Sequence, residues 1–279
     1  MLNIRKRGAR KLKCIWVLLI AAVLTLGLSG CNSSYKNILN MSNECQYILK
    51  ILNCDYEILS IKTKPQKIIQ RFNDLAEQGK TDGFYPLIII VSDTLVDTLY
   101  YEMKDIDVEN AAESIAAYRK SIIDSANEID AKEFLSAQFI ETDDFFGEFI
   151  QAEPDNDLSL KIYAFDLNSA VIIAKIPTAN PWELAAWIPM GGFNECPTPD
   201  EQVAVFHYWY DKYGAVPAVV SHDTWQMTLS KPPFTSEEAE ELAKEQFIFC
   251  SDIVLQGADT IRGLASTLID STTWFFWWD

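Results

Sequence analysis

The sequence predicts an α+β fold: a mixed sheet with hairpins, flanked by helices. Apolar runs of strand length recur along the chain, and several segments with helical spacing begin at helix-capping residues. Two strand-like segments, 158–165 and 170–176, are also joined by a short turn sequence, which is typical of a hairpin. Because strands, hairpins and helices are mixed and do not alternate strictly, the pattern favours α+β over a doubly wound parallel sheet.

The first 30 residues predict a lipoprotein signal peptide. The basic segment MLNIRKRGARKLK is followed by an apolar run from Cys14 to Leu28, which is shorter than the roughly 20 residues that a membrane-spanning helix needs. Leu28-Ser29-Gly30-Cys31 then resembles the lipobox of bacterial lipoproteins, whose cysteine is acylated after cleavage. The alternative is a plain N-terminal membrane anchor. Either way we expect the protein at the cell membrane on its extracytoplasmic face, with Cys31 as the lipidated residue.

Charge limits the partners that we expect. The whole chain has a formal charge of −17, and its first 30 residues contain six of the 23 basic residues and none of the 40 acidic ones. The remainder is therefore more negative still. Such a field repels nucleic acid and attracts basic molecules, so we expect no nucleic-acid binding and favour a basic protein as the partner.

Four parts are expected along the chain: the signal peptide (1–30), a polar tether (31–42), an N-terminal α/β region (43–150) and a C-terminal α+β domain (158–279). In the N-terminal region the spacing predicts helices over 44–52, 65–78 and 94–127, and strands over 56–62 and 85–91. Gly79 and Gly83 are expected to end the second helix. The uninterrupted apolar run 85–91 predicts a central strand. The acidic stretch 140–157 predicts a solvated boundary loop.

The C-terminal domain shows clear helix and strand signals. Capping boxes at Thr198-Pro199-Asp200-Glu201 and Thr235-Ser236-Glu237-Glu238 predict two helices that run to about Tyr213 and Phe249. A further helix is expected over 259–269. Strands are predicted over 158–165 and 170–176 as one hairpin, and over 184–188, 216–221, 224–229 and 273–278. The last of these is apolar on both faces, which predicts a central core strand.

The same region contains several distinctive segments: Pro181-Trp182, Trp187 to Pro197 (WIPMGGFNECP), Ala243 to Asp252 (AKEQFIFCSD), Gln256-Gly257 and the ending Trp274 to Asp279 (WFFWWD). Together they resemble a family of bacterial domains of unknown function, family 4253, and the likeness is strongest over 181–279. The family has no assigned activity, so the resemblance implies an architecture and no catalytic residue.

Four cysteines remain once Cys14 is cleaved off and Cys31 is acylated. Export would permit disulfides, and a Cys45–Cys54 bridge would close a short local loop. The alternative is that Cys45, Cys54, Cys196 and Cys250 are buried free thiols.

Asn194-Glu195-Cys196 is the sharpest candidate for chemistry. It lies close before a helix N-terminus, whose positive end favours a thiolate, and His207 or His222 would be the base of a cysteine-nucleophile site. The alternative is a structural cysteine in a tight Gly-Gly turn. Glu195 with Asp223 or with Asp252 is also a candidate for an acid–base pair.

Other site types are less favoured by the sequence. Trp209 is a candidate stacking platform for a ligand, since seven of the eight tryptophans follow residue 180. The chain has neither C-x-x-C nor H-x-x-x-H spacing and no phosphate-binding glycine pattern, so we predict no metal and no cofactor. The leading hypothesis is a non-catalytic, membrane-anchored binding or interaction module. The alternative is an envelope-associated hydrolase with a Cys/His or carboxylate site around Glu195 and Cys196.

Overall fold

The computed structural model describes residues 41–60, 62–104, 106, 111–136, 143–160 and 170–279. The predicted signal peptide, Cys31 and all of the tether before Met41 lie outside the described residues. Within those ranges no helix is both long and apolar enough to cross a membrane.

One mixed sheet of six strands organises the described chain. The strand order is β1-β3-β2-β4-β5-β6. β2 and β4 pair in parallel, and every other neighbouring pair is antiparallel. With the helices that flank it, the sheet confirms the predicted α+β class. The strands are β1 (Asp55–Ser60), β2 (Tyr85–Ile90), β3 (Ala170–Ile176), β4 (Val216–Val220), β5 (Thr224–Thr228) and β6 (Thr273–Trp277).

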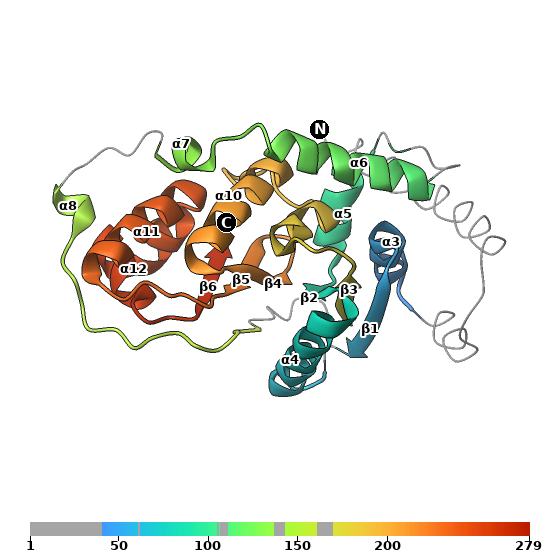
Figure 1. Cartoon of the computed structure of the whole chain (residues 1–279), viewed down its shortest axis with the longest axis horizontal. Helices are drawn as coiled ribbons and strands as arrows, with labels where there is room; N and C mark the ends of the chain where they lie inside the picture. Colours follow the sequence, from blue (N-terminus) through green and yellow to red (C-terminus); the bar gives the residue numbers. More distant parts are fainter. Residues whose placement is uncertain (1–40, 61, 105, 107–110, 137–142, 161–169) are drawn as a thin grey trace, which may run out of the picture.

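Most helices cover one face of the sheet. Leu87 and Ile89 of β2 belong to a large core with these helices, which are α3 (Asn43–Leu52), α5 (Asp93–Glu102), α6 (Ala111–Ala126), α7 (Ala131–Ser136), α9 (Leu184–Trp187), α10 (Pro199–Tyr213), α11 (Ser236–Phe249) and α12 (Ile261–Leu268). Ile88 faces the opposite side, where α4 (Pro65–Asp82) packs in a smaller core. Figure 1 shows α4 below the sheet and α5, α6 and α10 above it. β2 is therefore buried on both faces, as its apolar run predicts.

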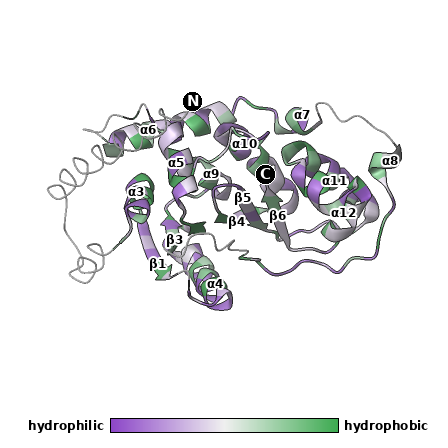
Figure 2. Cartoon of the chain, turned by 180° about the vertical axis from the view of Figure 1, so that it is seen from behind, coloured by the Kyte–Doolittle hydropathy of each residue, from purple (hydrophilic) through white to green (hydrophobic). Residues whose placement is uncertain are grey.

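Only one side of α4 contributes side chains to the smaller core. Ile68, Phe72 and Leu75 of this helix are buried, and the residues between them are exposed or half-buried. Figure 2 shows hydrophilic and hydrophobic residues along the same helix, as expected of an amphipathic surface helix.

The predicted hairpin over 158–165 and 170–176 is wrong. β3 pairs with β1 on one edge and with β2 on the other, so both of its edges are occupied. Leu158 to Leu160 form no strand, and 161–169 lie outside the described residues. The physical reason is that a strand this apolar is buried best in the middle of a sheet, between two long-range partners.

Three further expectations need correction. The stretch 184–188 is helical as α9 and follows a 3₁₀ turn, Pro181–Glu183, because a short apolar run with two alanines suits a buried helix as well as a strand. Helix 94–127 is divided into α5 and α6. β6 lies at the edge of the sheet: it buries Trp274 and Phe276, whereas Phe275 and Trp277 are half-buried. The predicted strands over 216–221 and 224–229 are confirmed as β4 and β5, which pair antiparallel.

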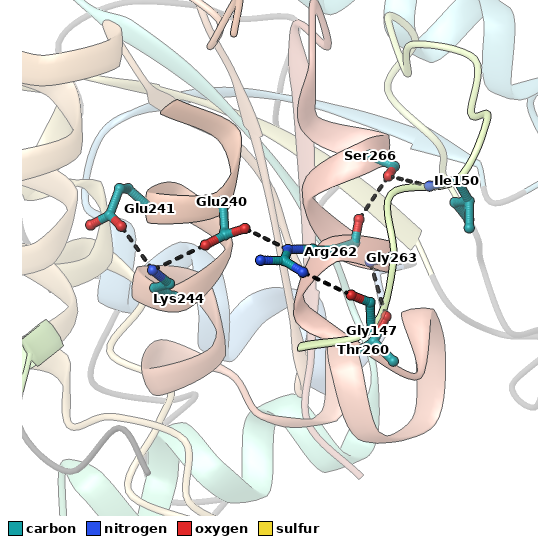
Figure 3. Close-up of polar contacts among 9 residues, drawn as sticks. All are labelled: Gly147, Ile150, Glu240, Glu241, Lys244, Thr260, Arg262, Gly263 and Ser266. Atoms are coloured by element: carbon teal, nitrogen blue, oxygen red, sulfur yellow. Dashed lines mark hydrogen bonds and ion pairs between the residues drawn. The ribbon is translucent and has the colours of Figure 1, made fainter. Parts of the chain in front are cut away.

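The acidic segment after the four-residue helix α8 (Asp143–Phe146) runs without helix or strand through residue 157, as predicted for a loop. Polar contacts nevertheless hold it against α12 (Figure 3). Arg262 donates to the carbonyl of Gly147 at 3.1 Å, and the Ile150 amide donates to Ser266 Oγ at 2.9 Å. Glu240 of α11 accepts from Arg262 Nε at 2.7 Å and pairs with Lys244 at 3.3 Å.

β1 and β2 come from the predicted N-terminal region, and β3 to β6 come from the predicted C-terminal domain. One sheet thus takes strands from both. Whether the two regions fold as separate domains stays a prediction.

Candidate functional site

A pocket of about 280 Å³ lies at one end of the sheet. β2 and β4 are parallel neighbours, so their carboxyl ends meet there, and such ends are where α/β sheets commonly bind ligands. α5 follows β2, the β4–β5 turn follows β4, and the chain after β6 ends at the same place. The lining residues are Thr94, Thr98, Phe193, Asn194, His222, Asp223, Trp278 and Asp279. Three predicted candidates, Asn194, His222 and Asp223, are therefore brought together.

Asp223 is the most fully bonded group in the pocket. Its Oδ1 accepts from Ser221 Oγ at 2.7 Å and from Thr224 Oγ1 at 3.0 Å, and its Oδ2 lies 3.2 Å from His222 Nε2. The Asp223 carbonyl also accepts from the Trp278 amide at 3.1 Å, which extends the β5–β6 ladder. These bonds hold the carboxylate in place beside the imidazole, and the two form an ion pair when His222 is protonated.

The loop from Gly191 to Pro197 forms another wall. Asn194 and Glu195 both have left-handed backbones, with φ of 44° and 61°. Asparagine tolerates this conformation, but for glutamate it costs roughly 1 kcal/mol or more. Strained residues of this kind cluster at functional sites. The two neighbouring side chains have different partners. Asn194 lines the pocket and donates to the main-chain oxygen of Asp279 at 2.7 Å, whereas Glu195 accepts from Ser251 Oγ at 3.5 Å.

Gln202 anchors that loop and is not among the residues that the sequence singles out. Its side chain is fully buried in α10, and Nε2 donates to the carbonyls of Met190 at 2.6 Å and Pro197 at 2.7 Å. Its Oε1 accepts from Trp225 Nε1 of β5 at 2.7 Å. The sequence feature that could have identified Gln202 is its position just before the apolar run Val203 to Phe206, on a helix that packs against the core.

Cys196 lies behind the pocket wall and is not among the residues that line it. It is 4% exposed, with Met190 Sδ at 4.0 Å. Burial, and secondarily the neighbouring Cys250, raise the pKa of its thiol well above the usual range. A nucleophilic cysteine needs a lowered pKa, so the structural-cysteine alternative describes this residue better.

The two histidines lie in different places. His222 lines the pocket, whereas His207 on α10 stacks on Trp182 with ring centroids 4.1 Å apart. His207 also lies 3.8 Å from Asp211, one turn further along the helix. In the described part of the chain no hydrogen bond joins either imidazole to Cys196, so the predicted Cys/His pair is not assembled.

Trp209 is a core residue and does not provide a ligand platform. It is fully buried, its ring stacks on Phe276 with centroids 5.4 Å apart, and Nε1 donates to Glu245 at 3.0 Å. Helical spacing places Trp209 on the apolar side of α10, but no local pattern reveals its hydrogen-bond partner, the half-buried Glu245 of α11.

The proposed Cys45–Cys54 bridge is not formed, and all four described cysteines are free thiols. Helix α3 explains why. Cys45 lies in its first turn and Cys54 follows its end, so at 1.5 Å per residue the helix holds them roughly 13 Å apart, beyond the reach of a disulfide. No group of three or more His, Cys, Asp or Glu residues within the described ranges could hold a metal ion.

Trp278 is a lining residue of the pocket whose indole nitrogen is itself buried. It is 2% exposed and packs against Phe249 and Phe276, yet its buried Nε1 has no hydrogen-bond acceptor among the described residues. A buried donor without an acceptor costs about 1–3 kcal/mol. Trp274 of the same core likewise has a buried indole N–H without an acceptor among the described residues, whereas Trp209 and Trp225 have acceptors.

A family model described as a domain of unknown function (DUF4253) matches residues 172–279. The match confirms the family resemblance seen in the sequence. It includes all the lining residues of the pocket except Thr94 and Thr98, which come from α5. No curated protein and no solved structure matches the chain.

Proposed function

We propose that this chain, whose residues 172–279 belong to the DUF4253 family, is a membrane-anchored extracytoplasmic lipoprotein that binds a ligand without transforming it. The N-terminal sequence pattern, with Cys31 at the end of the apolar run, supports the anchoring. The pocket at the carboxyl ends of β2 and β4 supports the binding.

The observation that carries the binding proposal is the composition of the pocket wall. It combines two aromatic rings, an amide, hydroxyls and carboxylates, which is the mixture that orients small ligands. Nucleophilic catalysis needs a nucleophile bonded to its base. The hydroxyls nearest to His222 along the chain, those of Ser221 and Thr224, donate to Asp223 instead.

Anchoring is tested by metabolic labelling. Bacteria that express the full chain are grown with a clickable palmitate analogue, and label on the protein is measured after gel separation. We expect the wild-type chain to be labelled and Cys31→Ser to be unlabelled, with Cys14→Ser as the matched control that keeps its label. Equal labelling of wild type and Cys31→Ser would overturn the proposal.

A hydrolase is the second candidate, and the His222–Asp223 pair is the observation that favours it. An imidazole oriented by a carboxylate is able to act as a general base on water, so the hydrolase would use this pair and not Cys196. Envelope material is incubated with wild type and His222→Gln, and the release of soluble fragments is measured by mass spectrometry. Binding without conversion predicts no release by either protein. Release by wild type alone would favour the hydrolase.

A further inference from the structure

The two edge strands of the sheet differ in whether other parts of the chain bond to their outer edges. The sheet ends in β6 on one side and in β1 on the other (Figure 1). On the outer edge of β6, the amide of Thr273 donates to the carbonyl of Asp155 at 3.2 Å. The carbonyl of Trp277, on the same edge, accepts from Cys250 Sγ at 3.0 Å. Two other segments of the chain therefore cover β6.

β1 presents backbone groups without partners on its outer edge. Successive residues of an antiparallel strand turn their amide and carbonyl groups alternately toward one neighbour and toward the other. The carbonyl of Ala170 in β3 accepts on the β2 side, so the following residue of β3 and every second one after it face β1. These residues lie opposite Glu57 and Leu59, among others. The amides and carbonyls of Tyr56 and Ile58 therefore point outward, and within the described part of the chain no hydrogen bond to them is found.

β1 also lacks the features that commonly prevent an edge strand from pairing with another chain. It contains no proline, glycine, lysine or arginine, and its register with β3 is unbroken. Glu57 is the charge in its interior, and this carboxylate is bound by Arg71 Nε at 2.7 Å and lies 3.7 Å from Lys175 Nζ. The side chains of Tyr56 and Ile58 are half-buried. A further strand would cover both.

The charges around β1 suit a second copy of the same strand. Asp55 begins the strand, Lys62 and Lys64 follow its end, and all three are exposed. Antiparallel pairing of two copies places the start of each strand beside the end of the other, so Asp55 of each copy lies near the two lysines of its partner. The segment 55–67 contains three lysines and two acidic residues, although the whole chain has a formal charge of −17. This edge is therefore balanced in charge within an acidic protein.

Membrane anchoring favours the same arrangement. Two antiparallel edge strands are related by a two-fold axis perpendicular to the sheet, so equivalent faces of both copies lie on the same side. Met41, the first described residue, packs with α3 against the large core on one of these faces. Both chains thus enter the dimer from one side, as the insertion of two anchors into one membrane requires.

We infer that two copies of this chain pair antiparallel through β1 and join their six-stranded sheets into one continuous sheet. The amides and carbonyls of Tyr56 and Ile58 bond to those of the partner copy, which is strand addition with a second copy as the added strand. The inference goes beyond the proposed function, because it concerns a surface away from the pocket. β1 also lies outside residues 172–279, so the N-terminal region supplies this interface to the family domain.

The oligomeric state of the purified full chain is measured in excess detergent by sedimentation velocity over a concentration series. We expect a dimer that dissociates on dilution. Ile58→Pro removes an outward amide and no bond to β3, so it should raise the dissociation constant about tenfold or more, since both copies lose the bond. Ile58→Ala is the matched control, because it shortens the same side chain and keeps the amide. It should remain dimeric.

Two results of this measurement would overturn the inference. A wild-type chain that is monomeric at every concentration would exclude the second copy as the occupant, in favour of a strand from another protein. Equal dimerisation of Ile58→Pro and Ile58→Ala would show that the interface lies elsewhere. Melting curves check that both variants are folded.

Hydrogen exchange tests the same contact without a substitution. The amides of Tyr56 and Ile58 have no partner in a single copy and should exchange rapidly in dilute protein. Raising the protein concentration should slow their exchange about tenfold or more, as measured by mass spectrometry with fragmentation to single residues. Rapid exchange at both amides that does not change over the concentration series would contradict the pairing.

Charge reversal tests the antiparallel arrangement. Asp55→Lys, and separately Lys62→Glu combined with Lys64→Glu, should each raise the dissociation constant about fivefold, because like charges then meet at both ends. An equal mixture of the two variants should recover the wild-type value, since opposite charges meet again. A mixture that dimerises no better than either variant alone would rule out this arrangement. Labelling of Cys31 is measured separately, so loss of anchoring with a retained dimer would overturn the proposed location alone.

Discussion

Gln202 does not line the pocket, but it holds the loop from Gly191 to Pro197 that forms one of its walls. It is fully buried, and it bonds to two loop carbonyls and to the indole of Trp225. Gln202→Leu fills a similar space and leaves two carbonyls and one indole N–H without these partners. At about 1–3 kcal/mol for each of these three unsatisfied groups, we expect a loss of at least about 3 kcal/mol in the free energy of unfolding, measured with urea.

The control for Gln202 is another glutamine in a helix. Gln78 is exposed and bonds to Asp82, one turn along α4. Gln78→Leu should change the free energy of unfolding by less than about 0.5 kcal/mol. If both variants lose equal stability, the buried bonds of Gln202 do not have the role described.

Thiol reactivity should follow burial and thiol pKa. Cys45, Cys196 and Cys250 are buried, and burial raises the pKa of all three; for Cys250 it reaches about 12. Cys54 is only half-buried, and burial raises its pKa to about 11 while the nearby Arg119 charge opposes the increase. In native protein at pH 8 we expect maleimide to label Cys54 first and Cys196 far more slowly, as read by peptide mapping. Labelling of Cys196 as fast as Cys54 would restore the nucleophile hypothesis.

The sequence identifies some of the pocket residues and misassigns others, for a physical reason. Asn194, His222 and Asp223 are recognisable because they are polar residues in turns that join strong helix and strand signals. Trp209 and Cys196 are plausible sites by residue type, but the structure gives them other roles. Burial by α11 and by β6, about 40 to 80 positions away, raises the pKa of the Cys196 thiol and determines the partners of both residues.

At the scale of elements, the two glycines at the end of α4 should respond differently to substitution: Gly79 lies in its last turn and Gly83 is its C-cap. A Cβ at Gly79 would collide with the Phe84 carbonyl, where the chain turns into β2, whereas a Cβ at Gly83 meets nothing within 4 Å and suffers only from φ of 78°. Gly79→Ala should lose more than about 2 kcal/mol despite a better helix propensity, and Gly83→Ala about 1 kcal/mol. Urea unfolding of both variants measures the difference. Equal losses would show that the helix end shifts to relieve the collision.

Comparing predicted with observed elements shows that local signals predict helix bounds better than they predict strand pairing. The spacing predicts that α4 ends at Gln78, but the structure continues the helix through Gly79 to Asp82, with Gly83 as the left-handed cap. The helices with capping boxes, α10 and α11, agree with their predicted bounds closely, because their start signals are local. The hairpin predicted for β3 is wrong because strand pairing is not local, and the true partners of β3 lie far away in the sequence.

At the scale of the whole molecule, the continuous sheet joins the two predicted regions. β3 has partners only in β1 and β2 among the described strands, and β2 is the parallel neighbour of β4. Helix α6 also packs against α10 and α9 across the same divide, and the Arg119 Cζ of α6 lies 3.4 Å from the ring centroid of Trp187 in α9. The sequence does not reveal these contacts, since apolar runs predict that strands exist and not which strands become neighbours.

Such a sheet should unfold as one cooperative unit. Ile89 is fully buried in β2, and Ile89→Ala should cost about 2–5 kcal/mol. Because β2 lies in the middle of the sheet, we expect native-state hydrogen exchange to accelerate by a similar factor in β2, β4 and β5, as measured by mass spectrometry under conditions of equilibrium exchange. The exposed substitution Gln78→Leu serves as the control and should change none of these rates. If Ile89→Ala accelerates exchange in β1, β2 and α4 while β4 to β6 keep their protection, then the predicted N-terminal region and C-terminal domain unfold separately, and the shared sheet is an interface between two domains.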